Sequence, residues 1–283
     1  VGSEMCIRDR YYKPLEIGDR LIVVPEWEET ELNGRVPLRL DPGLMFGTGS
    51  HATTRMCLEA LQNFELEGKR VLDLGCGVGK YGRVFASLGC DVTLADISPK
   101  MLEYAEKNMA EFTTPWRTLL CDFDEISAEE AMPNGRYELS ISTMSPAVHN
   151  VETVKKFAAI TDGRCFIAAF SQWSEPDRDE LFEHMGVERR TFNGNARQEC
   201  GKLIQSVSAA GFTPQVKYVD YCWSDERSID DTVRYMSERY FEPQEQTAGL
   251  CESLRSAVTE LAQNGVFTDR VNTRVAWIFW STK

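Results

Sequence analysis

The stretch Arg70-Val-Leu-Asp-Leu-Gly-Cys-Gly-Val-Gly-Lys-Tyr-Gly82 decides the fold predicted for this chain. Val71, Leu72 and Leu74 form a short apolar run, which is typical of a buried strand in a parallel sheet. The glycines that follow allow a tight turn into a helix, which we expect to begin near Lys80. The free backbone N–H groups at the start of such a helix point toward a ligand. This strand, glycine loop and helix predict a nucleotide-binding α/β fold.

A second acidic residue stands where such a fold needs one. Residues 91–95 form the next apolar strand, and Asp96 follows it, fourteen residues after Gly82. A carboxylate at the end of this strand can accept hydrogen bonds from both hydroxyls of a ribose. The pattern therefore indicates a ligand that contains a nucleoside.

Three kinds of ligand loop compete for these glycines. A P-loop requires Ser or Thr after Gly79-Lys80, and Tyr81 stands there instead. The dinucleotide fingerprint matches from Gly77 to Gly82, which keeps an oxidoreductase as one interpretation. The wider pattern Asp73-x-Gly75-x-Gly77-x-Gly79 more closely resembles the first motif of class I S-adenosylmethionine (SAM) methyltransferases. That resemblance implies a methionine site at Asp73, Gly75, Cys76, Gly77 and Gly79, and a ribose site at Asp96 with Ile97 beside it.

Length, composition and charge are those of a globular protein. The 283 residues suffice for one or two domains, and 42% of them are hydrophobic. The formal net charge of −13 disfavours a nucleic-acid partner, because phosphate binding needs a basic face. The nine cysteines form no Cys-x-x-Cys pair, so we expect neither a disulfide framework nor a metal site, and a cytoplasmic location. No apolar run approaches the ~20 residues that cross a membrane, so we expect no membrane partner.

The N-terminal part divides into a leader and a β segment. Residues 1–10 begin with Val1 and show no periodicity, so we expect a non-native leader. Residues 11–45 predict a β segment or linker, with strands at residues 21–24 and 36–40. Residues 46–283 are expected to form the SAM-binding domain.

A second resemblance lies upstream of the glycine loop, in Asp41-Pro-Gly-Leu-Met-Phe-Gly-Thr-Gly-Ser-His-Ala-Thr-Thr-Arg55. This segment resembles the one that precedes the SAM motif in ribosomal protein L11 methyltransferase, and residues 11–27 are similar to that family as well. The resemblance implies a loop over SAM, with cofactor contacts at Phe46, Thr48 and Thr54, or Thr53 in place of Thr54. His51 is either a proton acceptor or substrate contact, or a loop residue that caps backbone groups. Arg55 either pairs with the SAM carboxylate or is exposed on its helix.

The remaining strands are predicted at residues 117–120, 137–142, 164–171, 212–223 and 274–280, with helices at 99–109, 151–159 and 203–210. The fold class expected is α/β, Rossmann-like, with seven mostly parallel strands and an antiparallel last strand. In the class I pattern an acid after the third strand contacts the adenine amino group. We assign this contact to Asp122, with Phe123 against the ring, and the alternative is a pair of solvent-exposed acids.

The segment after the fourth strand borders the transferred methyl group in the class I fold. Families that hold a planar nitrogen carry Asn/Asp-Pro-Pro-Tyr there, and L11 methyltransferase carries an Asn, whereas this chain offers hydroxyl groups. We predict Ser142 as a cofactor contact, and Thr143, Ser145 and His149 as catalytic candidates. His149 is expected to be a base or a substrate contact, and a surface histidine is the alternative.

A helical insertion is expected at residues 224–271, before the last strand, with helices at 229–240 and 248–263. Class I sheets usually join these strands by a short hairpin, so the insertion is either a lid over the substrate or a helical pair at the surface. We interpret the chain as a SAM-dependent methyltransferase related to the L11 enzymes, acting on a protein or a small molecule. A small-molecule methyltransferase with a helical lid and a non-catalytic SAM-binding protein are the alternatives.

Overall fold

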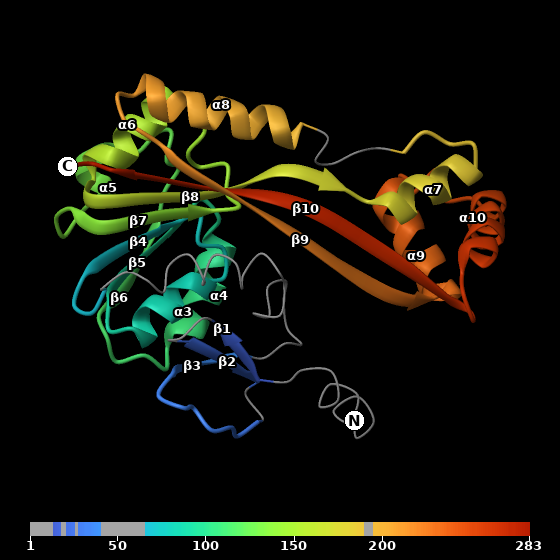
Figure 1. Cartoon of the computed structure of the whole chain (residues 1–283), viewed down its shortest axis with the longest axis horizontal. Coiled ribbons are helices and arrows are strands. Elements are labelled where there is room, and N and C mark those ends of the chain that lie inside the picture. Colours follow the sequence, from blue (N-terminus) through green and yellow to red (C-terminus); the bar gives the residue numbers. More distant parts are fainter. Residues whose placement is uncertain (1–13, 18–20, 26–27, 41–65, 190–194) are drawn as a thin grey trace. The chain divides into compact units, whose positions relative to one another are not determined.

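A seven-stranded sheet forms the framework of the computed structural model, which describes residues 14–17, 21–25, 28–40, 66–189 and 195–283 (Figure 1). The strand order is β6-β5-β4-β7-β8-β10-β9. These strands are β4 (Arg70–Leu74), β5 (Asp91–Asp96), β6 (Trp116–Leu120), β7 (Tyr137–Thr143), β8 (Thr161–Ser174), β9 (Gln215–Ser228) and β10 (Val266–Ser281). Strands β6, β5, β4, β7 and β8 are mutually parallel neighbours. The strand order reverses between β4 and β7, which is where such sheets bind ligands.

The last strand of the sequence is antiparallel, as predicted. Gly163 near the start of β8 exchanges hydrogen bonds with Thr282 just beyond the end of β10: each backbone N–H donates over 3.0 Å, one to the threonine Oγ1 and the other to the glycine carbonyl. Strands β9 and β10 are also antiparallel, because their paired residue numbers run in opposite directions. The pairs are Lys217 with Trp277, Asp220 with Arg274 and Arg227 with Asp269.

Helices cover both faces of the parallel part of the sheet (Figure 1). Helices α3 (Lys80–Ser87) and α4 (Pro99–Met109) pack on one face, and α5 (Ala128–Ala131), α6 (Val151–Ala159) and α8 (Ala196–Ala209) lie on the other. The core of the second face contains Leu72, Phe157, Ile167, Val207 and Ile278. Among the described helices, none has the length and apolar character needed to cross a bilayer.

A separate three-stranded sheet contains β1 (Leu15–Ile17), β2 (Leu21–Pro25) and β3 (Val36–Leu40). Strand β1 is antiparallel to β2, and β2 is parallel to β3. The two strands predicted here are confirmed, and β1 is an addition that its three residues were too few to signal. The expected leader at residues 1–10 lies outside the described residues.

The chain forms two compact units. The first comprises Val1–Ala169, Glu199–Val219 and Ala276–Lys283, and the second comprises Phe170–Gln198 and Asp220–Val275. The second unit contains α7 (Pro176–His184), α9 (Ile229–Tyr240) and α10 (Ala248–Leu261), which share their own apolar cluster around Phe182, Met236 and Leu254. The helical insertion predicted at residues 224–271 falls within this unit, but its ends were wrong, because residues 224–228 belong to β9 and residues 266–271 to β10. The unit also includes the unpredicted helix α7. The function of the insertion as a lid stays a prediction.

A buried ion network stabilises the second unit. Arg178 donates from Nε and Nη2 to both carboxylate oxygens of Asp269, over 2.7 and 2.8 Å, and Asp269 has no exposed surface. The remaining nitrogen of Arg178 donates to Glu175 over 2.5 Å and to the hydroxyl of Tyr240 over 2.9 Å. Arg227 donates to the same Asp269 carboxylate over 2.8 Å. Strand β10 and helices α7 and α9 therefore meet at the Arg178 guanidinium, and the end of β9 joins them through Asp269.

Replacing Arg178 by Met should destabilise the second unit by about 3–5 kcal/mol, because Glu175 and Asp269 would keep buried charges without their main partner. Urea unfolding measures the loss, and amide hydrogen exchange should locate it in α7 and the adjoining part of β10. Arg255→Met is the matched control, since its partner Asp230 is 79% exposed and such pairs contribute less than about 1 kcal/mol. Equal unfolding free energies for the two variants would contradict a stabilising network.

Candidate functional site

A cavity of about 560 Å³ opens at the carboxyl ends of four neighbouring strands. Strand β4 ends at Leu74, β5 at Asp96, β6 at Leu120 and β7 at Thr143, and the cavity is lined by residues at or just after these ends. The lining residues are Leu74, Gly75, Asp96, Ile97, Cys121, Asp122, Phe123, Asp124, Met144, Ser145, Pro146, Ala147 and His149. All four strand ends therefore contribute to one site.

The predicted site residues divide into three groups. Those that line the cavity are Gly75, Asp96, Ile97, Asp122, Phe123, Ser145 and His149. Those placed beside or beneath it on the same segments are Asp73, Cys76, Gly77, Gly79, Ser142 and Thr143. Those outside the described residues are Phe46, Thr48 and Thr54, together with His51, Thr53 and Arg55.

Asp96 fixes the glycine loop. Its carboxylate accepts the N–H of Gly77 through one oxygen and the N–H of Ser98 through the other, each over 2.8 Å. Gly75 and Cys76 donate their N–H groups to the carbonyl of Ala95, over 2.8 and 3.0 Å. The loop after β4 is thus held against the end of β5, and the carboxylate predicted to bind ribose stands at the junction.

Gly75 allows two loops to approach each other closely. Its φ is +72°, and a Cβ built there would lie 2.0 Å from Oγ and 2.5 Å from Cβ of Ser145. Met144, which precedes that serine, has a φ of 53°. Few residues other than glycine adopt this left-handed conformation, and it turns the chain sharply after β7. The absence of a side chain at position 75 therefore sets the distance between the β4 and β7 ends of the cavity.

Asp73 lies in β4 with no exposed surface, and neither of its carboxylate oxygens has a hydrogen-bond partner among the described residues. Burial, and then the nearby charge of Asp96, raise the pKa of Asp73 to about 7. The hydroxyl of Ser142 in β7 is also buried without a partner in the part of the chain that the structure describes. Asp73 and Ser142 are thus buried polar side chains on strands that end at the cavity, and neither of them lines it.

The wall after β6 is acidic. Asp122 and Asp124 are exposed, and Asp122 accepts the backbone N–H of Asp124 over 3.0 Å. Phe123, between them, is buried and packs edge-on against Phe157 at a centroid distance of 6.2 Å. Together with Asp96, these acids give the lining three carboxylates, and the lining residues include no Lys or Arg. The carboxylates of the described lining are therefore not matched by a Lys or Arg of that lining.

His149 stands opposite this acidic wall. Its Nδ1 lies 3.1 Å from the carbonyl of Pro146, and its Nε2 lies 3.0 Å from the side-chain amide nitrogen of Asn150 and 3.8 Å from Asp124. A carbonyl accepts and an amide nitrogen donates, so these contacts assign the proton of the neutral ring to Nδ1. Nε2 is then an acceptor already engaged by Asn150.

Sequence reasoning missed several lining residues: Leu74, Cys121, Asp124, Met144, Pro146 and Ala147. Each lies within two positions of a residue that was predicted, so the strand ends were located correctly and the number of lining residues was underestimated. No cluster of three metal-ligating side chains occurs within the described ranges.

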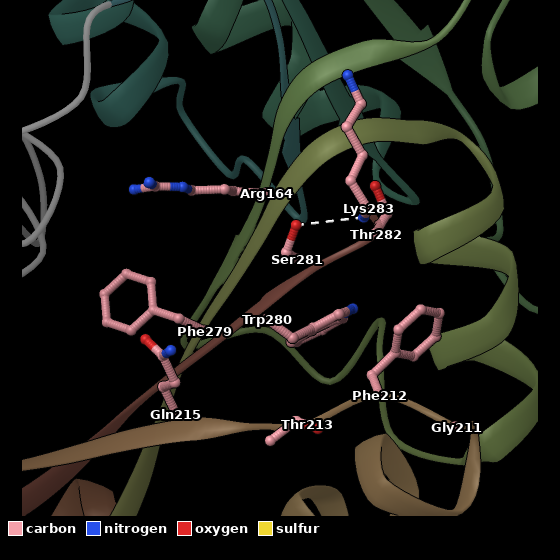
Figure 2. A pocket seen from close by; sticks show the side chains of 10 residues that line it. All are labelled: Arg164, Gly211, Phe212, Thr213, Gln215, Phe279, Trp280, Ser281, Thr282 and Lys283. Carbon is pink, nitrogen blue, oxygen red and sulfur yellow. Dashed lines mark hydrogen bonds between the residues drawn. The ribbon is translucent and has the colours of Figure 1, made fainter.

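A second cavity of about 810 Å³ lies at the opposite edge of the sheet (Figure 2). Arg164 near the start of β8, Gln215 at the start of β9 and Lys283 beyond β10 contribute to its lining, and Figure 2 shows Trp280 between Phe279 and Phe212. None of the predicted site residues lines it, and its lining carries no Asp or Glu side chain. The cavity at the ends of β4, β5, β6 and β7 is therefore the candidate site.

Comparison with known proteins relates the N-terminal half of the chain to one family. Residues 7–130 match the sequence model described as ribosomal protein L11 methyltransferase (PrmA). A ribosomal protein L11 methyltransferase from Clostridium botulinum (strain Eklund 17B / Type B) is 33% identical over 166 residues, 56% of this chain and 50% of the relative. Another, from Symbiobacterium thermophilum, is 37% identical over 123 residues, 43% of this chain and 40% of the relative. The predicted resemblance to this methyltransferase family is thus confirmed.

The chain spans half the length, or less, of these curated relatives. Among solved structures, a ribosomal protein L11 methylase from Lactobacillus delbrueckii subsp. bulgaricus has a TM-score of 0.49 and 20% identity, and covers 74% of this chain and 93% of its own. The matched residues 7–130 include the glycine loop, Asp96 and Asp122, and they end before β7. The match to the family model therefore covers three of the four strand ends at the site.

The close approach at Gly75 predicts a large effect of a single methyl group. Gly75→Ala should destabilise the protein more than Gly68→Ala, because Gly68 has a similar φ of +70° and nothing within 4 Å of an added Cβ. Both variants carry the ~1 kcal/mol strain of a left-handed alanine, and only the first also displaces Ser145. Urea unfolding measures the difference. Adding Ser145→Gly to Gly75→Ala should remove the extra destabilisation relative to Gly68→Ala. If the extra destabilisation remains, Ser145 is not the obstacle.

The raised pKa of Asp73 predicts a pH-dependent stability. Between pH 3.8, the ordinary pKa of Asp, and about 7, the unfolded chain ionises this carboxyl while the folded chain keeps it protonated. The folded state then binds more protons, so its stability falls as pH rises through this window. Relative to Asp73→Asn, which has no charge to bury, the wild type should lose free energy of unfolding from pH 5 to pH 7 and then level off. If the free energies of unfolding of the wild type and Asp73→Asn differ by the same amount from pH 5 to pH 8, the raised pKa of Asp73 would be contradicted.

Proposed function

We propose that this chain is a SAM-dependent methyltransferase that uses the cavity at the ends of β4, β5, β6 and β7. The observation that carries the proposal is the convergence of the glycine loop, Asp96, Asp122 and Ser145 on one cavity. The first three belong to the region that matches the L11 methyltransferase family. Because the matched relatives are about twice as long as the shared region, activity and acceptor are inferred here from the site itself.

The charge of the cavity favours SAM over a dinucleotide. SAM carries a sulfonium and an ammonium against one carboxylate, whereas a dinucleotide brings a negatively charged pyrophosphate. Three carboxylates in the lining, with no Lys or Arg among the lining residues, attract the former and repel the latter. This argues against the oxidoreductase interpretation that the glycine spacing alone leaves open.

The predicted residues are assigned to the parts of SAM according to the strand end on which they lie. Asp73, Gly75, Cys76, Gly77 and Gly79 are assigned to the methionine end. Asp96 retains free lone pairs for the ribose hydroxyls beside its two backbone N–H bonds, and Ile97, 65% exposed, offers an apolar surface. Asp122 and Phe123 are assigned to adenine, and Ser142 in β7 is assigned to a further contact with the cofactor. Phe46, Thr48 and Thr54 remain candidates from the sequence.

In the reaction, a nucleophile of the acceptor attacks the methyl carbon of SAM, the carbon–sulfur bond breaks, and its electron pair stays on sulfur. The protein then has to align the nucleophile, exclude water and receive one proton. Ser145 and His149 face the cavity beside the glycine loop and the acidic wall, and Thr143 lies in β7 behind them. His149 can take the proton of the methyl acceptor only if Nε2 gives up its hydrogen bond from Asn150. Without the Asn that the family carries here, the hydroxyls of Thr143 and Ser145 are the groups that orient the nucleophile.

The acceptor is a protein if the chain is an L11-type enzyme, and a small molecule if it is a small-molecule methyltransferase. The relatives' name, ribosomal protein L11 methyltransferase, makes a ribosomal protein the first candidate. The second unit, with its own apolar core and ion network, is our candidate for a substrate-covering element. Seven described cysteines are free, which supports a reducing compartment such as the cytoplasm.

The test combines SAM binding with methyl transfer. Calorimetry should detect SAM binding by the wild type, and Asp96→Asn should weaken it by roughly tenfold or more, because charge-assisted hydrogen bonds to the ribose are lost. Asp162→Asn is the matched control, since Asp162 pairs with Lys283 at the other edge of the sheet. Methyl-labelled SAM with a desalted bacterial lysate, separated by ultrafiltration, then identifies the acceptor.

Label at the size of a small ribosomal protein would support an L11-type enzyme. Label that appears only in the filtrate, after metabolites are added back, would support a small-molecule enzyme. SAM binding without any label would contradict the transferase and favour a SAM-binding protein. Binding of a nicotinamide dinucleotide in place of SAM would overturn the proposal altogether.

A further inference from the structure

Lys156 contacts the loop that forms the acidic wall of the cavity. It lies in the last turn of α6, and its Nζ donates to three backbone carbonyls: those of Phe123 over 2.7 Å, Asp124 over 3.0 Å and Ile126 over 2.7 Å. The same ammonium stands 5.3 Å from the centroid of the Phe123 ring. One side chain therefore joins α6 to three of the four residues that follow Asp122.

An ammonium group has three N–H donors, and here each has a carbonyl acceptor. The carbonyls belong to the connection between β6 and α5. The other hydrogen bonds of its backbone leave these three carbonyls to Lys156: Cys121 donates its N–H to the carbonyl of Asp96 over 3.1 Å, Asp124 to the Asp122 carboxylate over 3.0 Å, and Glu125 and Ile126 to the carbonyl of Asp122 over 3.2 and 2.9 Å. Three carbonyl dipoles turned toward one point repel each other unless a cation lies between them, so the conformation of this loop depends on Lys156.

Helix α6 provides a rigid base for this contact. Val154 and Phe157, on either side of Lys156, are completely buried, and Phe157 packs against the ring of Phe123. At the other end of the helix, Asn150 accepts the N–H of Thr153 over 2.8 Å and contacts His149. The helix thus holds both the acidic wall and the opposite wall of the cavity at fixed positions.

We propose that Lys156 is a positioning residue for adenine recognition: by gathering three carbonyls it orients Asp122 toward the adenine amino group and Phe123 toward the ring. The inference rests on the proposed function and adds to it a residue outside the cavity lining. Lys156 acts through the loop and does not touch the ligand. Its neighbour Lys155 is exposed on the same helix and has no hydrogen bond or ion pair with the described residues.

Lys156→Met keeps the length of the side chain and removes its three donors, and Lys155→Met is the matched control. Calorimetry with SAM should give a Kd about tenfold higher for Lys156→Met and a value within twofold of the wild type for Lys155→Met. The kcat at saturating SAM should change less than about threefold, since the methyl end is held by the glycine loop. Lys156→Arg should recover part of the affinity at most, because a planar guanidinium does not converge on three carbonyls.

The decisive readout is discrimination between bases. Inosine lacks the amino group of adenosine, so the ratio of their Kd values reports the contact at Asp122. The Kd for inosine divided by the Kd for adenosine should fall in Lys156→Met and in Asp122→Asn. The double variant should show no further fall, because both changes remove the same contact. General destabilisation would leave the ratio unchanged in the fraction that stays folded.

The outcomes separate the two proposals. A wild type that binds neither SAM nor adenosine would overturn the proposed function and this inference with it. A wild type that binds both, with an unchanged ratio and affinity in Lys156→Met, would overturn the inference alone. Additive losses in Lys156→Met and Asp122→Asn would equally contradict a positioning role.

Discussion

The hydrogen bonds from Gly77 and Ser98 to Asp96 are the interaction on which the site depends. One carboxylate at the end of β5 takes up two backbone N–H groups, one from the loop after β4 and one from its own turn toward α4. The loop is thereby closed before any ligand is present. Because Gly75 then meets Ser145 without an intervening side chain, the end of β7 is drawn to the same place. Parallel strands bring these ends to one edge of the sheet, and these two contacts bring them within reach of one ligand.

The sequence predicted this part well because its signals are local. The glycine spacing after β4 and the acids after β5 and β6 identify strand ends, and strand ends are what line the cavity. The second unit was harder to predict from the sequence. Strands β8, β9 and β10 run 14, 14 and 16 residues, and the exposed, charged parts of β9 and β10 gave little apolar periodicity. Helix α7 buries Leu181 and Phe182 and also takes part in the ion network, and in the sequence only Pro176 and two acids in its first turn signalled its start. The contact between Lys156 and the β6 loop joins segments about 30 residues apart and is visible only in three dimensions.

Charge has two different functions in this acidic chain. In the second unit, buried acids are paired with arginines, and the pairing joins helices to a strand. At the cavity, Asp73 and Asp96 have no cationic partner among the described residues, and burial raises the pKa of Asp73 to about 7. A bound cation would favour ionisation of the buried acid, so binding and proton release are linked.

The site has two halves, which differ in whether they lie within the match to the L11 methyltransferase family model. The half formed by β4, β5 and β6 lies within residues 7–130, where the chain resembles L11 methyltransferases, and it contains the carboxylates suited to the nucleoside. The half formed by β7 and the start of α6 lies beyond that match, and it offers hydroxyls and His149 in place of the family's Asn. A hydroxyl rotates freely and both donates and accepts, whereas an amide side chain presents a fixed planar pair. In the proposed reaction, the acceptor therefore has to contribute more of its own orientation than one held by a planar amide.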